Sequence, residues 1–282
     1  MRNLNSLPAL LCGIAVLIAG CGDSANTVTG TPGHGSDAKL PSATAHRNTI
    51  EGRDDVHIVS ASGDINAALG EFRALLGAPN PNVAGEQPGG RREINWDAVP
   101  ALVTNVDNFP GTFFNVNSPR GVLLTTDGSG FRISDNGYKD VNPAYAGEFV
   151  AFSAPKLFVA RGSTVTDVRF VVAGSNTQAL VTGFGSVFED VGRANSTTIE
   201  FFDIDGNRIL KIATPRATDA NGISFVGAVF DAGVVARVRI TSGDTPIGSD
   251  VEDNVKGEGQ KRDIVAMDDF IYGEPRAPKP AN

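Results

Sequence analysis

Two adjacent aspartates near the end of the chain, Asp268 and Asp269, are its sharpest chemical feature. They interrupt the apolar run 264–272, whose composition is that of a strand. Because adjacent strand residues face opposite sides, one carboxylate is expected on an apolar face, where an ionised group is costly unless paired or bound to a cation. The pair predicts either ligands for a structural Ca²⁺ or, the favoured alternative, a salt bridge, a backbone cap or a bulge that turns both acids to solvent.

Two other acidic stretches have calcium-like composition. Asp203-Ile204-Asp205-Gly206-Asn207 has the opening spacing of a calcium loop, but Lys211 stands where the loop needs a bidentate acid. It is therefore predicted to be the turn of a hairpin. The charged stretch at 250–253, which ends in Asp253, is expected to be a solvated loop.

A carboxylate hydrolase remains an alternative. Glycosidase chemistry needs two carboxylates about 5–9.5 Å apart, and Glu200 and Asp203 lie near each other on or beside one strand. Their spacing does not match the Glu-x-Asp-x-x-Glu motif of sandwich glycosidases. A hydrolase or lyase would rest on analogy of fold alone, so no catalytic residue is assigned.

The distribution of histidine and cysteine excludes several kinds of chemistry. His34, His46 and His57 all precede the expected folded region, and residues 58–282 contain neither histidine nor cysteine. This excludes Ser-His-Asp and Cys-His catalysis, zinc sites with His or Cys ligands, and haem or iron–sulfur ligation in that region. A non-catalytic protein is favoured.

Glycan binding would use aromatic side chains and planar hydrogen-bonding groups. The candidates are the aromatic residues Trp96, Tyr138 and Tyr145, with Arg91 and Arg92 as donors. One Trp and three Tyr are few for a lectin. Packing of the predicted helix onto the sheets is the favoured alternative for Trp96.

The first residues have the order of a secretory signal. Arg2 precedes an apolar stretch from Leu7 to Gly20, and the small pair Ala19-Gly20 stands directly before Cys21. This arrangement resembles the lipobox of bacterial lipoproteins, and the resemblance implies acylation of Cys21, export and a membrane anchor. Gly22, in place of an Asp, favours the outer membrane by the same resemblance.

Four segments follow from composition and from this resemblance. We expect residues 1–20 to be the signal peptide, 21–57 a lipidated cysteine with a disordered tether, 58–275 a β-sandwich domain and 276–282 a disordered tail. The chain of 282 residues has a formal net charge of −8, which argues against nucleic acid and anionic lipid as electrostatic partners.

The elements that must position these residues are mostly strands. Apolar spacing predicts one short helix over 64–76, ended by Gly77. Turn residues predict hairpins around 127–130 and 203–207. The expected strands lie at 121–126, 131–134, 148–153, 167–173, 180–188, 197–202, 208–212, 223–230, 234–241 and 264–272. The fold class is therefore all-β, a jelly-roll-like antiparallel β-sandwich with one short N-terminal helix.

Four stretches of the expected domain resemble a group of uncharacterised exported bacterial proteins. The stretches are Gly90-Arg91-Arg92-Glu93-Ile94-Asn95-Trp96-Asp97, 181–191, 194–203 and 267–275. Similar sandwich modules occur in proteins with a C-terminal PEP-type sorting tail, whereas this chain ends in Pro-Arg-Ala-Pro-Lys-Pro-Ala-Asn. The resemblance implies a sandwich fold and export. Asp268-Asp269 also looks similar to the final-strand acids that hold calcium in sandwich carbohydrate-binding modules.

Together these features predict a lipid-anchored, non-catalytic module for adhesion, glycan binding or contact with an envelope protein. The alternatives are the carboxylate hydrolase or lyase and a structural surface component without a small ligand. An aromatic groove would favour binding, facing carboxylates would favour catalysis, and a flat sandwich would favour the structural role.

Overall fold

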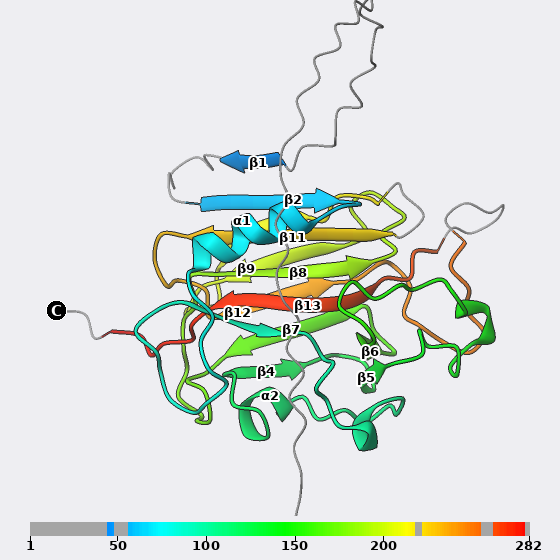
Figure 1. Cartoon of the computed structure of the whole chain (residues 1–282), viewed down its shortest axis with the longest axis horizontal. Helices are drawn as coiled ribbons and strands as arrows, with labels where there is room; N and C mark the ends of the chain where they lie inside the picture. Colours follow the sequence, from blue (N-terminus) through cyan, green and yellow to red (C-terminus); the bar gives the residue numbers. More distant parts are fainter. Residues whose placement is uncertain (1–43, 48–55, 218–221, 255–261, 280–282) are drawn as a thin grey trace, which may run out of the picture. The chain divides into compact units, whose positions relative to one another are not determined.

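The computed structural model describes residues 44–47, 56–217, 222–254 and 262–279. Cys21, the predicted signal peptide and most of the predicted tether lie outside these residues. The described residues form two antiparallel sheets packed as a sandwich (Figure 1). None of the helices in this part of the chain is long and apolar enough to cross a lipid bilayer.

The larger sheet has eight strands in the order β1-β2-β11-β8-β13-β6-β5, with β3 also paired to β13. Their bounds are β1 Thr44–Arg47, β2 Val56–Ser62, β3 Arg91–Ile94, β5 Gly130–Ser134, β6 Leu157–Arg161, β8 Gly183–Glu189, β11 Ile223–Phe230 and β13 Ala266–Gly273. The smaller sheet has five strands in the order β10-β9-β12-β7-β4. Their bounds are β4 Val122–Thr125, β7 Val165–Phe170, β9 Thr198–Phe202, β10 Arg208–Ala213 and β12 Arg237–Thr241.

The chain passes repeatedly from one sheet to the other. Successive strands from β6 to β9 alternate between the sheets, as do those from β10 to β13. This alternation is the jelly-roll pattern, and the predicted fold class is confirmed. Aromatic and aliphatic side chains from both inner faces fill the space between the sheets, among them Phe184, Phe201 and Phe270, which are fully buried.

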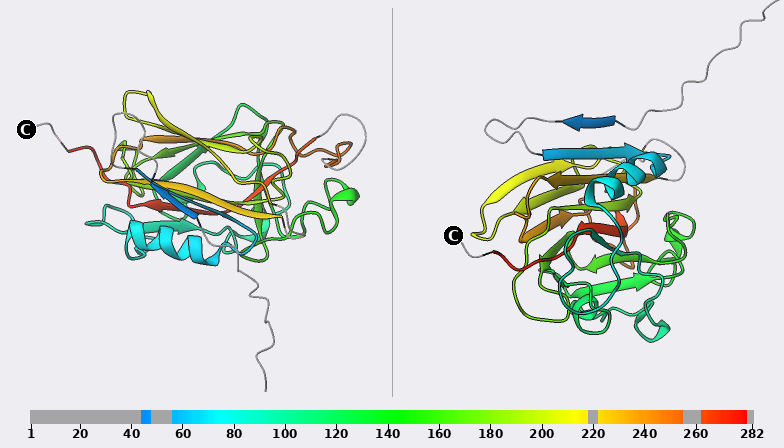
Figure 2. Two further views of the ribbon diagram at one scale, coloured as in Figure 1. Left: turned by 90° about the horizontal axis from the view of Figure 1, so that it is seen from above. Right: turned by 60° about the vertical axis from the view of Figure 1, so that its left-hand side comes forward.

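One helix, α1 (Asn66–Leu76), packs on the outer face of the eight-stranded sheet (Figure 2, left). Its buried residues include Leu69 and Phe72, which lie against β2, β11 and β13. Glycines of two adjacent strands make room for Phe72: a Cβ at Gly227 would lie 2.6 Å from its ring, and one at Gly185 would lie 3.0 Å from it. The helix expected over 64–76 is confirmed.

An irregular segment, residues 135–155, covers another part of the same outer face. Its Tyr138, Tyr145 and Phe149 form a buried cluster with residues of β6 and β13. It contains the 3₁₀ turn η2 (Pro143–Tyr145), and two further short helices, η1 (Ala101–Val103) and α2 (Phe113–Val116), precede it. Among the described residues, no helix packs on the outer face of the five-stranded sheet (Figure 2).

One hairpin prediction and one strand prediction are wrong. The stretches 121–126 and 131–134 do become strands, but β4 pairs with β7 in one sheet and β5 pairs with β6 in the other. Their connecting turn therefore joins the two sheets rather than closing a hairpin, because turn residues determine a reversal and not the partner. The strand expected at 148–153 is irregular, since the amides of Phe152 and Ser153 donate to carboxylates instead of to a neighbouring strand.

Candidate functional site

Four of the five residues predicted to bind a glycan are buried. The exposed fractions are 1% for Trp96, 0% for Tyr138, 1% for Tyr145 and 1% for Arg92. Side chains with so little exposed surface cannot form a platform for a sugar ring, so their predicted ligand-binding role is corrected to a structural role.

The two arginines bind carboxylates and carbonyls of the fold. The guanidinium of Arg92 donates to both oxygens of Glu274, at 2.7 and 2.8 Å, inside the protein. It also donates to the carbonyls of Pro81, Val83, Gly85 and Pro119, and so ties the loop 79–89 to the sheet. Arg91 donates to Glu93 at 2.6 Å and to the carbonyl of Gly77. These contacts satisfy both cations within the fold.

Trp96 lies in the core between the sheets, where its indole ring stacks on Phe158 with centroids 4.2 Å apart. Helix α1 packs on the other side of the eight-stranded sheet, so the expected packing of Trp96 against the helix is also wrong. The indole Nε1 donates to the backbone carbonyl of Asp268 at 2.7 Å. One edge of Trp96 is thereby tied to the aspartate pair.

A β-bulge contains the aspartate pair. Met267 pairs with Phe188 and Phe270 pairs with Ser186, so Asp268 and Asp269 together face a single residue of β8. The bulge reverses the alternation of faces that the sequence implied. Met267 and Phe270 therefore both enter the core, and both acids contact groups on the outer side, Ser153 and Arg73.

The hydroxyl of Ser153 lies between the two carboxyl groups. Its Oγ is 2.8 Å from Oδ1 of Asp268 and 2.7 Å from Oδ1 of Asp269, and its backbone amide donates to Oδ2 of Asp268. A hydroxyl has one proton, so the second short contact requires a proton on a carboxyl group. Burial, followed by the charge of Asp269, raises the pKa of Asp268 to about 8. The pair thus holds one shared proton at neutral pH.

The predicted calcium site at this pair does not fit its surroundings. Calcium needs six to eight oxygen ligands. The pair instead meets hydrogen-bond donors, the amide of Ser153 and the guanidinium of Arg73, which lies 3.6 Å from Oδ2 of Asp269. The favoured salt-bridge alternative describes Asp269, but neither acid is turned to solvent, since 0% of Asp268 and 4% of Asp269 is exposed.

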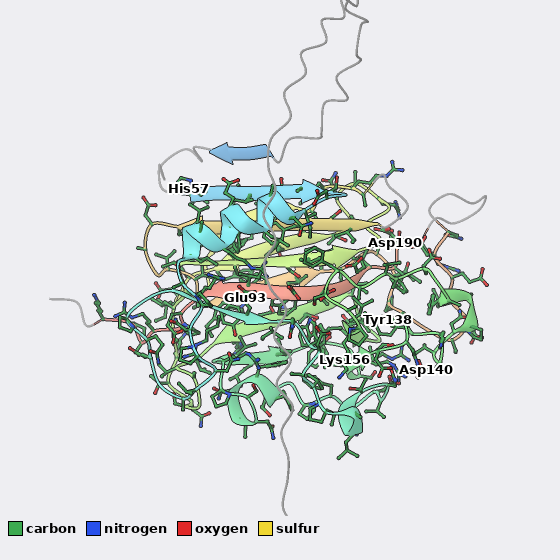
Figure 3. The ribbon with its side chains drawn as sticks, viewed as in Figure 1. His57, Glu93, Tyr138, Asp140, Lys156 and Asp190 are labelled. Atoms are coloured by element: carbon green, nitrogen blue, oxygen red, sulfur yellow. The ribbon has the colours of Figure 1, made fainter. Side chains whose placement is uncertain are left out.

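A second group of acids lies at the end of β8, where Figure 3 labels Asp190. Glu148, Asp190 and Asp253 have carboxylate oxygens within 4.8 Å of one another. Burial, followed by the charge of Asp253, raises the pKa of Asp190 to about 8. Oxygen ligands of this kind suit a hard cation, although Asp253 also accepts from the amide of Ile264 at 2.8 Å. The sequence offered no signal for this grouping, because its members are distant along the chain.

The predicted turn at 203–207 closes the hairpin of β9 and β10, as expected. The carboxylate of Asp203 accepts from the amides of Asp205 and Asn207, at 3.0 and 2.8 Å. This is a turn-stabilising arrangement. Glu200, the other candidate for glycosidase chemistry, accepts from Arg208 and Lys211. Burial raises the pKa of Glu200, but these cations outweigh it and hold that pKa below its ordinary value.

The outer face of the five-stranded sheet carries two rows of side chains. The strand register places in one row Leu123, Arg169, Arg237, Phe202 and Arg208, and in the next Thr125, Asp167, Arg239, Glu200 and Lys211. The second row alternates acids and cations, which pair across strands. The first row has no acid, and Arg237 lies over the ring of Phe202 at 3.7 Å. The face is therefore locally cationic in an acidic chain.

A groove of about 480 Å³ lies along part of the first row. Arg169, Arg237 and Leu123 form part of it, together with the exposed amides of Asn176 and Gln178. The tip of the β9–β10 hairpin supplies another wall. Arg169 is exposed, and its side chain takes part in none of the side-chain hydrogen bonds or ion pairs among the described residues.

A smaller pocket of about 320 Å³ lies between residues 95–100 and 113–120. Trp96 and Phe114 contribute to it from the core, and Asn117 and Arg120 from the segment after α2. Sequence reasoning missed Arg120, because an isolated arginine in a loop carries no motif.

No family model matches the chain, and no curated protein matches it. Several solved structures show similarity to the chain. The enzymatically active domain of bacteriophage CBA120 tailspike protein 4 gives a TM-score of 0.27 at 16% identity, over 62% of this chain and 22% of that one. TmCBM61, solved with β-1,4-galactotriose, gives a TM-score of 0.26 at 10% identity, over 60% of this chain and 95% of that one. These values are too low to inform function.

Proposed function

We propose that the protein is an exported, lipid-anchored, non-catalytic module that binds a glycan on the outer face of the five-stranded sheet. The observation that carries this proposal is the groove on that face. Helix α1 and the segment 135–155 cover the other sheet, while this one presents its side chains outward beside a hollow of about 480 Å³.

The groove has the chemistry that sugar hydroxyls require. Asn176 and Gln178 each offer both a donor and an acceptor, and the planar guanidinium of Arg169 can donate to two neighbouring oxygens. Leu123 adds an apolar contact for the C–H face of a sugar ring. Few convergent polar groups on an apolar base are typical of small-ligand sites.

The candidate carboxyl groups that the sequence offered for hydrolysis argue for binding without catalysis at the groove. A general acid needs a raised pKa, but cations keep that of Glu200 low. Asp203 is engaged by its own turn, and Asp268 and Asp269 are closed to a substrate by their burial. The groove also counts against a purely structural component, for which a flat sandwich was expected.

Binding is tested with the full-length protein in detergent on a glycan array. We expect a defined set of glycans to bind, and Arg169→Ala to reduce that binding roughly tenfold or more, the usual effect of losing a charged hydrogen bond. Arg216→Ala is the matched control, because Arg216 is also exposed and lies beyond the other end of β10. Absence of glycan binding, or equal loss in both variants, would contradict the proposal.

The anchor rests on Cys21 and the residues before it. In cells fed an alkyne fatty acid, we expect the wild type to be labelled and to sediment with the outer membrane. Cys21→Ser should be unlabelled and released, because thioether acylation needs the cysteine sulfur. Equal labelling of both proteins would refute the lipid attachment.

A further inference from the structure

The pocket between residues 95–100 and 113–120 contains a cation without an acid. Arg120 stands in its lining together with Asn95, Asn117 and Ser118, and the described residues of the lining include no carboxylate. The walls are otherwise apolar and include Phe113 and Phe114. This pocket therefore differs from the groove of the five-stranded sheet, where the hairpin tip supplies aspartates.

The side chain of Arg120 is only partly satisfied by the protein. Its Nη1 donates to the hydroxyl of Ser118, and its guanidinium carbon lies 5.1 Å from the centre of the Phe114 ring. Its Nε is buried and makes no hydrogen bond within the described residues. None of the ion pairs among those residues includes Arg120.

The fold nevertheless holds this arginine firmly. The backbone amide of Arg120 donates to the carbonyl of Phe114 at 2.8 Å, and its carbonyl accepts from the hydroxyl of Tyr272 at 3.0 Å. Burial lowers the pKa of Arg120, and the charge of Arg92 lowers it further, while Tyr272 acts in the opposite direction. A half-buried guanidinium without a counter-ion is costly, and a bound anion would remove that cost.

We propose that this pocket binds a carboxylate-bearing sugar, a hexuronate residue, through the guanidinium of Arg120. A carboxylate matches the planar fork of arginine, which can donate to both of its oxygens. The amides of Asn95 and Asn117 and the Ser118 hydroxyl suit the ring hydroxyls, and the phenylalanines suit the apolar face of the ring. A volume of about 320 Å³ corresponds to a small ligand.

The pocket is independent of the groove that carries the proposed function. Their described linings share no residue. A monosaccharide can therefore be assigned to one or the other by variants. Because the two linings are separate, the hexuronate proposal can be refuted while glycan binding on the five-stranded sheet is upheld, and the reverse is also possible.

The test is isothermal titration calorimetry, in which galacturonate or glucuronate is added to the full-length protein in detergent. We expect saturable binding of at least one hexuronate, and a loss of affinity of roughly ten- to a hundredfold in Arg120→Gln. Arg120→Lys should retain part of the binding, since it keeps the charge but loses the fork. Arg169→Ala should bind the hexuronate as the wild type does. Melting temperatures show whether each variant is folded.

Other ligands separate the possible sources of anion binding. Galactose and glucose, which lack the carboxylate, should not bind at the same concentrations, and neither should inorganic phosphate or acetate. The proposal is overturned if no hexuronate binds, if a neutral sugar or phosphate binds equally well, or if a folded Arg120→Gln variant binds normally. Loss of hexuronate binding in Arg169→Ala alone would place the ligand in the groove and would also overturn it.

Discussion

Replacing Asp268 by asparagine should remove a pH dependence from the stability of this protein. The introduced amide can donate its N–H to Ser153 Oγ, whose own proton then goes to Asp269, while the amide oxygen accepts from the Ser153 backbone N–H. All three contacts of the native pair are kept. The variant therefore imitates the protonated state of the pair, without a group that can ionise at position 268.

The magnitude follows from the shared proton. Asp268 has a folded pKa of about 8 and an ordinary value of 3.8, so between these values the folded protein holds a proton that the unfolded chain releases. Folded stability is then lost as the pH rises, by about 1.4 kcal/mol per pH unit. From pH 5 to pH 7 the wild type should lose about 3 kcal/mol relative to Asp268→Asn, or about 5–10 °C in Tm. Asp190 contributes to both proteins and cancels in the difference.

The assay is thermal and urea unfolding of both proteins at half-unit steps from pH 5 to pH 8. Asp231→Asn, which changes an exposed acid, controls for net charge and should keep the slope of the wild type. A shared proton at Asp268 is ruled out if Asp268→Asn has the same slope as the wild type. A uniform large loss of stability at every pH would likewise show that the pair holds no shared proton.

Two further predictions concern packing and metal. Gly227→Ala should destabilise the fold by about 1–3 kcal/mol, because the new Cβ would lie 2.6 Å from the Phe72 ring. Gly70→Ala in helix α1, the helix that contains Phe72, should be neutral or stabilise by up to about 1 kcal/mol, since nothing lies within 4 Å of the position of the new Cβ. Urea unfolding that showed both substitutions to be destabilising, or both to be stabilising, would contradict this expectation. EDTA should leave the Tm difference between the wild type and Asp268→Asn unchanged, because the pair meets donors rather than calcium ligands. If EDTA changed the Tm of the wild type but not that of Asp268→Asn, the result would instead support a calcium site at this pair.

Local patterns predicted several elements correctly. The helix was found because Ile65, Leu69, Phe72 and Leu76 recur with helical spacing, and the hairpin of β9 and β10 because its turn residues connect two strand-like runs. Strands β2, β3 and β6 were not predicted, although β6 is an apolar run (Leu157–Arg161). Whether such a short run becomes a strand depends on the strands that pair with it, and the local sequence does not specify those partners.

The candidate site was less accessible than the fold. Trp96 was singled out for its chemistry, but burial of all but 1% of its surface depends on Phe158 and Phe270, which are distant along the chain. Arg120 became notable only when the tertiary structure showed a pocket without an acid around it. Binding residues depend on which groups remain unpaired, and pairing is a property of the folded chain.

By itself the sequence determined the all-β class, the one amphipathic helix and the position of most strands, because these depend on apolar periodicity and turn residues within a few positions. The tertiary structure decided which sheet each strand joins and which face each acid occupies. The bulge at Asp268 and Asp269 illustrates the reason. One extra residue opposite β8 reverses the alternation of faces, and the groups that contact the bulge, from Trp96, Ser153 and Arg73, come from three other parts of the chain.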